Sequence, residues 1–188
     1  MPKCGNAVYG VALNFRAELE SLGAPPIAPV LYLRPRNTWN TSGAPIRLPD
    51  GVKQLKMAGT VGVMIGAGYI AVNDVSIPHE SYYRPAIRQR CRDGFCVIGS
   101  EVTDRKPEEI RIWINGGLRC RSSIADLVRP VERLIADISE FLTLQPGDIL
   151  LIGEPPDAPL AQAGDKVRVE VTGLPAIENE VMAEVAPE

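Results

Sequence analysis

Short β-rich runs separated by proline and glycine constrain this chain more than any other feature of its sequence. The 188 residues include 17 prolines and 17 glycines. Proline is excluded from central strands and helix interiors, and glycine favours turns, so long regular elements are disfavoured. The apolar and β-branched runs between them predict strands at residues 8–13, 30–33, 60–65, 69–72, 110–114, 148–152 and 166–171. We therefore expect a mainly β (α+β) domain.

One long helix is expected among these strands. After Pro130, apolar residues recur at spacings of three and four, which is typical of an amphipathic helix with one face on the core. These residues are Val131, Leu134, Ile135, Ile138, Phe141 and Leu142. A shorter helix is predicted at residues 17–22, and Asn115-Gly116-Gly117 predicts a hairpin turn. Strands and helices do not alternate as in a βαβ fold.

Four glycines in the middle of the chain require a separate interpretation. Gly59, Gly62, Gly66 and Gly68 fit neither a phosphate-binding P-loop nor a complete dinucleotide-binding motif between a strand and a helix. We interpret them as turn glycines or as glycines at sites of close packing.

Length and charge limit the function classes. The length fits a single domain at residues 1–188, with residues 1–50 as an N-terminal segment packed on it. The net charge is −3 and the pI about 5.3, which argues against nucleic-acid and membrane-surface partners. No apolar run approaches the roughly 20 residues of a membrane span, and the first residues lack an apolar signal core, so we expect a cytoplasmic location.

Cysteine and histidine are too sparse for a zinc site. The four cysteines form no C-x-x-C pair, and His79 is the one histidine in the sequence. We expect the thiols to be reduced.

Five ordered segments carry a resemblance to a known family. The most specific is Asn73-Asp74-Val75-Ser76, followed by Ser81-Tyr82-Tyr83-Arg84-Pro85 and by the block at residues 90–99. Residues 10–15, 29–38 and 144–153 and the closing stretch at 173–179 match in the same order. The chain thus resembles the fumarylacetoacetate hydrolase family, and its block at 90–99 is similar to that of the enzymes that degrade 4-hydroxyphenylacetate. The resemblance implies a mixed β-sandwich roll.

The resemblance also implies a function, with alternatives. It implies a subunit, or one half, of an isomerase/decarboxylase that decarboxylates an oxopentene tricarboxylate or isomerises a hydroxyheptadiene dioate through a metal-stabilised enolate. The implied partners are a keto acid with two or three carboxylates and either a second copy or a paralogous subunit that keeps the metal ligands. A non-catalytic scaffold or regulatory subunit is the alternative, and an acylpyruvate hydrolase or oxaloacetate decarboxylase is a weaker one.

The family's metal site is incomplete in this sequence. Family members bind Mg²⁺ or Mn²⁺ through a Glu-x-Glu pair on a strand and the aspartate of the Asn-Asp-x-Ser signature. Here Ala58 and Thr60 stand at the glutamate positions, and only Asp74 remains. We therefore expect the chain alone to bind the metal weakly or not at all. Glu18 stands where the family has its histidine base and would serve as a base if desolvated; the alternative is a solvated glutamate at the start of a helix. Glu154 replaces a hydroxyl residue of the Thr-Gly-Thr-Pro loop, where its negative charge disfavours an anionic substrate unless an arginine neutralises it.

Basic and aromatic residues near the signature form the candidate anion site. Tyr83, Arg84 and Arg90 lie within the motif and are expected to bind substrate, because arginine holds carboxylates through a planar fork. Arg88 and Arg92 are interpreted mainly as basic surface residues.

Overall fold

Two β-sheets make up most of the structure, a computed structural model that describes residues 7–20, 26–79 and 86–184. The larger sheet has the order β2-β1-β10-β5-β6-β7-β3, and β11 also pairs with β5. Its strands are β1 (Val8–Ala12), β2 (Val30–Leu33), β3 (Trp39–Thr41), β5 (Leu55–Met64), β6 (Gly68–Ser76), β7 (Cys96–Thr103), β10 (Ile149–Leu151) and β11 (Leu160–Ala161). The pairs β1–β10 and β3–β7 are parallel and the other pairs are antiparallel, so the sheet is mixed.

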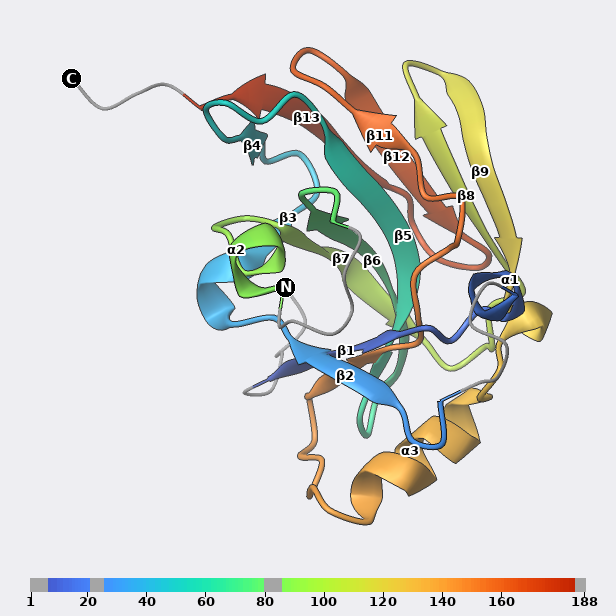
Figure 1. Ribbon diagram of the computed structural model, residues 1–188. Coiled ribbons are helices and arrows are strands. Elements are labelled where there is room, and N and C mark those ends of the chain that lie inside the picture. The colour runs from blue at the N-terminus through green and yellow to red at the C-terminus, as the bar shows by residue number, and fades with distance from the viewer. Residues whose placement is uncertain (1–6, 21–25, 80–85, 185–188) are drawn as a thin grey trace.

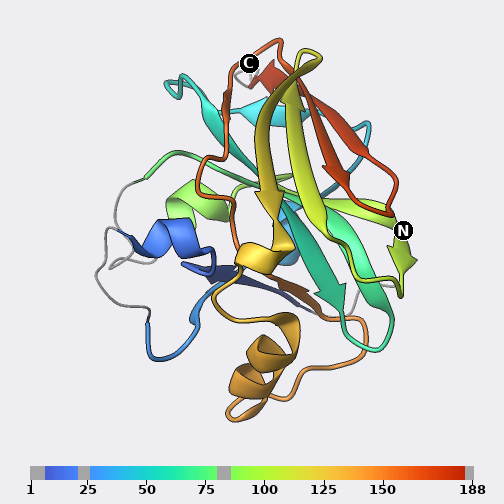
Figure 2. The ribbon, with the colours of Figure 1, turned by 90° about the vertical axis from the view of Figure 1, so that its right-hand side faces the viewer.

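The smaller sheet has five strands in the order β4-β13-β12-β8-β9. They are β4 (Ile46–Leu48), β8 (Glu109–Ile114), β9 (Gly117–Ser123), β12 (Lys166–Val171) and β13 (Ile177–Ala183). In Figures 1 and 2 the strands β8, β9, β12 and β13 lie together on one side of β5, and β5 contacts both β8 and β12. The two sheets thus face each other, as the expected β-sandwich roll requires.

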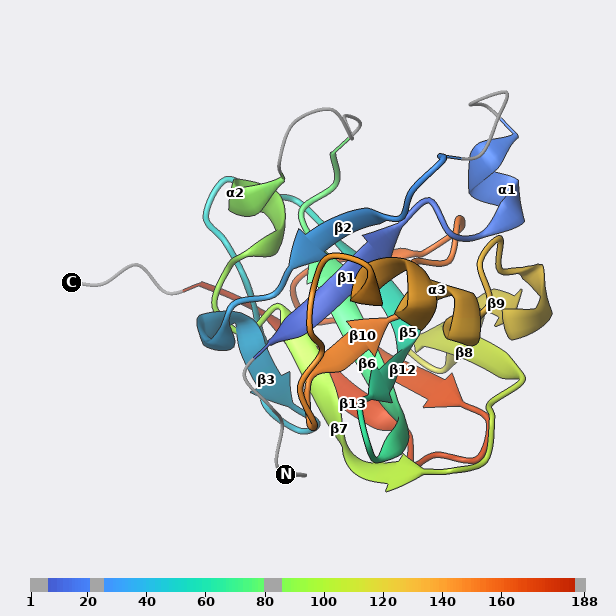
Figure 3. The same ribbon diagram turned by 90° about the horizontal axis from the view of Figure 1, so that it is seen from below.

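Helices are short among the described residues. They are α1 (Arg16–Leu19), α2 (Ile87–Arg90) and α3 (Val131–Ser139), with 3-10 turns η1 (Arg36–Thr38) and η2 (Ile124–Asp126). Helix α3 lies below β1 in Figure 1, and in Figure 3, which shows the molecule from below, it lies in front of β1 and β10. It buries Val131, Leu134 and Ile138, which confirms the predicted helix and most of its apolar face. The inclusion of Phe141 was wrong: the helix ends at Ser139, and Phe141 is 69% exposed.

All seven predicted strands are present, and β5 and β6 are several residues longer than their sequence patterns indicated. Strand β5 begins at Leu55 and β6 runs through Ser76, because the two pair in register over nine positions. Asp74 therefore lies within a central strand. The predicted short helix corresponds to α1 at Arg16–Leu19, and residues 21–25 lie outside the described residues.

The predicted hairpin turn and the close-packing glycine are both present in the structure. Asn115 and Gly116 both have positive φ, at 51° and 78°, and they form the turn between β8 and β9. A Cβ on Gly59 would lie 2.7 Å from Val169 Cγ1 of the facing sheet. Glycine at this position allows the two sheets to approach closely.

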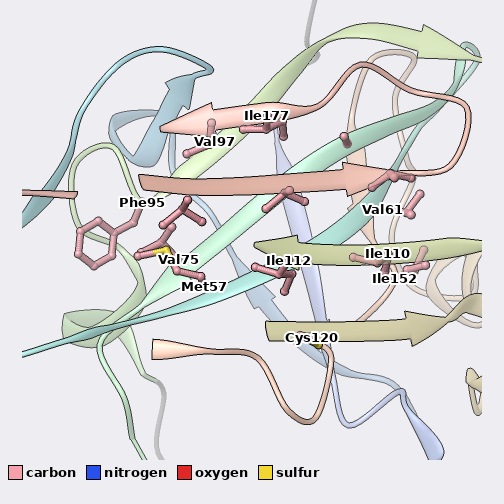
Figure 4. Packing of buried hydrophobic residues seen from close by; sticks show 14 of the residues in the cluster. Met57, Val61, Val75, Phe95, Val97, Ile110, Ile112, Cys120, Ile152 and Ile177 are labelled. Atoms are coloured by element: carbon pink, nitrogen blue, oxygen red, sulfur yellow. The ribbon is translucent and has the colours of Figure 1, made fainter. Parts of the chain in front are cut away.

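The hydrophobic core fills the space between the sheets. Side chains from the facing strands, and from residues next to strand ends, meet there, as Figure 4 shows for Met57, Val61, Val75, Phe95, Val97, Ile110, Ile112, Cys120, Ile152 and Ile177. Residues before position 50 contribute β1, β2 and β3 to the larger sheet and β4 to the smaller one. No helix among the described residues is long and apolar enough to cross a membrane.

Candidate functional site

Asp74 lies at the centre of a group of charged side chains that we call the ion cluster: Arg34, Lys56, Asp74, Arg90 and Glu154. Asp74 pairs across the sheet with Ala58 and is fully buried. Its carboxylate forms an ion pair with Arg34 and lies 3.4 Å from Arg90 Nη1. The hydroxyl of Tyr32 also donates a hydrogen bond to it.

Glu154 is the second carboxylate of the cluster. It follows β10, and its side chain is 3% exposed. Arg90 pairs with one oxygen, and Lys56 Nζ lies 2.8 Å from the other. Burial alone would raise the pKa of Glu154, but Arg90 and Lys56 outweigh burial and lower it to about 2. The sequence placed a negative charge in this loop, and the structure supplies the neutralising arginine.

Arg34 and Arg90 are held on several sides. Arg34 is buried and donates hydrogen bonds to the carbonyl of Val75, at 2.6 Å, and to that of Arg90. The Arg90 guanidinium stacks 4.2 Å from the centroid of the Tyr32 ring. Burial disfavours both cations, but Asp74 raises the pKa of Arg34, and Tyr32, Glu154 and Asp74 raise that of Arg90. Both guanidinium groups therefore remain charged.

Asn14 and Thr60 fix the loop that carries Glu154. The buried Asn14 side chain donates to the carbonyl of Ile152, at 2.7 Å, and to that of Arg129. Thr60 Oγ1 donates to the carbonyl of Gly153 at 2.6 Å. Gly153 has φ of 140°, and a Cβ there would lie 3.2 Å from Asn14 Cβ. The end of β1 and the middle of β5 thus hold the loop in one position.

Glu18 lies on α1, at the edge of this arrangement. Its carboxylate accepts a hydrogen bond from the backbone N–H of Phe15 at 3.2 Å, which closes the first turn of the helix. Burial raises the pKa of Glu18 to about 7; the Phe15 hydrogen bond and the positive charge of Lys56 oppose the rise, and the negative charge of Glu154 adds to it. A carboxyl group that titrates near neutral pH can both accept and release a proton.

The residues present do not fit the divalent metal of the family. Both positions where the glutamates were expected lack a carboxylate: Ala58 is apolar, and the Thr60 hydroxyl is committed to Gly153. The Asp74 carboxylate is surrounded by two arginines, which repel a cation. Within the described part of the chain, no three His, Cys, Asp or Glu side chains gather in a way that could hold a metal.

The structure brings some predicted site residues together and leaves others undescribed. Asp74 and Arg90 lie in the ion cluster. Tyr83 and Arg84 fall outside the described residues, so their roles stay predictions. Arg88 is exposed, and Arg92 is partly buried.

Sequence reasoning missed Tyr32, Arg34 and Lys56 as members of the site. The spacing of these residues along the chain was a signal. Lys56 precedes Ala58 by two residues and so shares its strand face, and Tyr32 precedes Arg34 by the same spacing.

Comparison with known proteins fixes the family. The chain matches the family described as "Fumarylacetoacetate (FAA) hydrolase C-terminal" over residues 7–182. The chain belongs to the fumarylacetoacetate hydrolase family.

Two proteins illustrate the similarity. The 4-hydroxyphenylacetate degradation bifunctional isomerase/decarboxylase of Salmonella dublin is 40% identical over 94% of this chain and 47% of its own length. The chain thus spans about half the length of this enzyme and of the other bifunctional isomerase/decarboxylases that it matches. The structure of 2-hydroxyhepta-2,4-diene-1,7-dioate isomerase from Mycobacterium marinum has a TM-score of 0.84 at 25% identity, covering 98% of this chain and 77% of that one.

A more distant structure records a metal. Maleylpyruvate hydrolase from Sphingobium sp. SYK-6, in complex with manganese(II) and pyruvate, has a TM-score of 0.80 at 20% identity, covering 96% of this chain and 71% of that one. This likeness shows the shared fold.

Proposed function

We propose that this chain is one subunit, or one half, of an isomerase/decarboxylase that acts on dicarboxylate or tricarboxylate keto acids of 4-hydroxyphenylacetate catabolism. The reaction is decarboxylation of an oxopentene tricarboxylate, isomerisation of a hydroxyheptadiene dioate, or both. The observation that carries the proposal is the 40% identity to a bifunctional isomerase/decarboxylase over 94% of the chain. The isomerase structure at 25% identity supports the same substrate class.

The chemistry of the site agrees with this proposal. Both reactions pass through an enolate-like state, which is stabilised by fixed positive charge next to the developing oxyanion. Arg90 and Lys56 supply such charge, held in place by Glu154. Glu18, with a pKa of about 7, is our candidate for the group that moves the proton. Tyr83 and Arg84 remain candidates for binding a substrate carboxylate.

A partner is part of the proposal. Because the chain spans about half of its bifunctional relatives, we propose that it pairs with itself or with a paralogous chain that keeps the metal-binding carboxylates. Light scattering at tens of micromolar, with and without that paralogue, tests this. A monomer that recovers no partner in a pull-down experiment would contradict it.

The activity is tested by an assay of the purified chain on both keto acids, alone and with the companion chain. Loss of a carboxylate is followed as released CO₂, and isomerisation as the change in ultraviolet absorbance of the conjugated diene. Glu18→Gln, which keeps size but cannot take up the proton, is expected to lower kcat by about 10²-fold or more. Unchanged turnover in Glu18→Gln would remove Glu18 from the mechanism, and no turnover in any combination would contradict the proposed function.

A non-catalytic scaffold is the second candidate. The observation that favours it is the mutual pairing within the ion cluster, in which both carboxylates are satisfied by cations of the same chain. If the companion chain is fully active alone and gains only stability from this chain, the scaffold function is the correct one.

A further inference from the structure

Asn14, just beyond the end of β1, is fully buried and uses every polar atom of its side chain. Its amide group donates to the carbonyl of Ile152 at 2.7 Å and to that of Arg129 at 3.1 Å, and its oxygen accepts from the Arg129 N–H at 2.9 Å. Exchanging the amide nitrogen and oxygen would place the oxygen against two carbonyl groups, so these contacts fix the orientation of the side chain. One side chain thus joins the start of α1, the loop that carries Glu154 and the segment that leads into α3.

The backbone on both sides of this contact is unusual. Leu13 is buried and has φ of 58°, a conformation that leucine rarely adopts. Gly153 has φ of 140°, and a Cβ there would lie 3.2 Å from Asn14 Cβ and 3.3 Å from Phe15 Cδ2. Two conformations that most side chains disfavour therefore meet at Asn14, which indicates that the packing of the site fixes this contact.

This contact lies between the segments that carry the two carboxyl groups Glu18 and Glu154. Glu18 follows Asn14 in the first turn of α1, where its carboxylate closes that turn. Glu154 directly follows Gly153 in the loop after β10. From outside α1, Glu154 and Lys56 of β5 act on the charge of Glu18, and the largest effect on its pKa is burial. All of these effects depend on how closely the start of α1 packs against the loop.

We propose that Asn14 is a positioning residue, which fixes α1 against the loop and so holds the Glu18 carboxyl group in its buried place near Glu154. That Glu18 moves a proton rests on the proposed function, whereas the contact itself rests on the hydrogen bonds of Asn14. Without the Asn14 side chain, the Ile152 carbonyl loses this donor and the backbone of Arg129 loses both of these bonds, so α1 and the loop are expected to loosen and admit water to Glu18. Because burial is the main cause of the raised pKa of Glu18, water lowers that pKa toward its ordinary value.

The pKa of Glu18 in the absence of substrate tests this role. It is measured by an NMR titration of the chain with isotope-labelled glutamate, in which the Glu18 signal is assigned by its loss in Glu18→Gln. The titration midpoint of the wild-type chain is expected at a pH of about 7, and that of Asn14→Ala at least about one pH unit lower. Asn14→Ser keeps one hydroxyl donor and should give an intermediate midpoint.

Asn179 provides a matched control. It is also buried and donates to two carbonyl groups, those of Thr41 at 2.9 Å and Ala44 at 2.7 Å, but it lies on β13 of the smaller sheet. Asn179→Ala should therefore lose a comparable pair of hydrogen bonds and leave the titration midpoint of Glu18 unchanged. A purely structural role of Asn14 would make the two alanine variants alike in this titration.

The outcomes separate the inference from the proposed function. Equal Glu18 midpoints in Asn14→Ala and Asn179→Ala would overturn the inference, even if the chain turns over keto acids. A lowered midpoint without any turnover would support the role of Asn14 and contradict the proposed function. With turnover, the acidic limb of the kcat profile of Asn14→Ala should move to lower pH by the same amount, because Glu18 acts as a base only after it loses its proton. Thermal denaturation shows which variants are folded during the titration, and if Asn14→Ala is not, the comparison with Asn179→Ala is made with Asn14→Ser.

Discussion

Replacing Asp74 with asparagine should reveal whether this carboxylate belongs to an ion cluster or to a metal site. Asparagine keeps the size of the side chain and an oxygen that can accept the hydrogen bond from Tyr32. It removes the negative charge that faces Arg34, fully buried, and Arg90, at 3.4 Å. The new amide N–H groups add a donor where two cationic donors already stand.

The expected loss of stability is large. Removing one partner of a buried ion pair costs about 3–5 kcal/mol, because the other charge stays buried without compensation. That is a large part of the roughly 5–15 kcal/mol that stabilises a typical domain. Urea denaturation in EDTA measures the free energy of unfolding of both proteins. The control is Glu132→Gln, whose exposed pair with Lys106 should change stability by less than about 0.5 kcal/mol.

A second substitution tests the cause of that loss. In the Asp74→Asn background, Arg34→Met removes the uncompensated cation and should restore part of the stability, with a coupling energy of at least about 2 kcal/mol. Restoration is incomplete because Arg34 also donates to the carbonyl groups of Val75 and Arg90. An aspartate in an acidic metal site behaves in the opposite way: without metal, its removal relieves repulsion and stabilises the fold. If Asp74→Asn is more stable than the wild-type chain in EDTA, the ion-cluster argument is refuted.

Glu18→Gln should gain stability relative to the wild-type chain as pH rises from 5 to 8. The pKa of Glu18 in the folded chain, about 7, exceeds the ordinary 4.5, so the folded wild-type chain holds a proton that it loses over this range. That loss lowers the stability of the wild-type chain by up to about 2–3 kcal/mol after allowance for partial exposure. Urea denaturation at both pH values checks this, and an equal difference at both would contradict it. Gly59→Ala should destabilise the fold by about 1–3 kcal/mol, because its new Cβ would lie 2.7 Å from a valine methyl of β12. Gly117→Ala serves as the control in the same denaturation experiment, because its new Cβ meets nothing closer than 3.5 Å. Arg84→Ala should weaken dicarboxylate binding about 30-fold or more by calorimetry, and Arg84→Lys should restore only part of it; a change within twofold of Lys106→Ala would show that Arg84 does not bind the anion.

Local patterns in the sequence determined much of the fold. Strict alternation over Lys166–Val171 and the three-and-four spacing after Pro130 both correspond to observed elements, because each pattern reflects a single buried face. The signature around Asp74 pointed to the family, which the match over residues 7–182 confirms. The limits of β5 and β6 were not local properties, since they depend on the pairing of the two strands with each other.

Some features of the site follow from the sequence, and others follow only from the tertiary structure. From the sequence by itself, the family resemblance predicted that Ala58 and Thr60 stand at the positions of the metal-binding glutamates, Glu18 at that of the base and Glu154 in the loop. Only the tertiary structure decided which charges meet. Lys56 and Glu154 are 98 positions apart, and Arg34, which follows β2, meets Asp74 of β6. Such pairs form because the chain topology brings these residues into one buried space, where an unpaired charge would be too costly. That cost depends on tertiary contacts, so it cannot be read from spacings within the sequence.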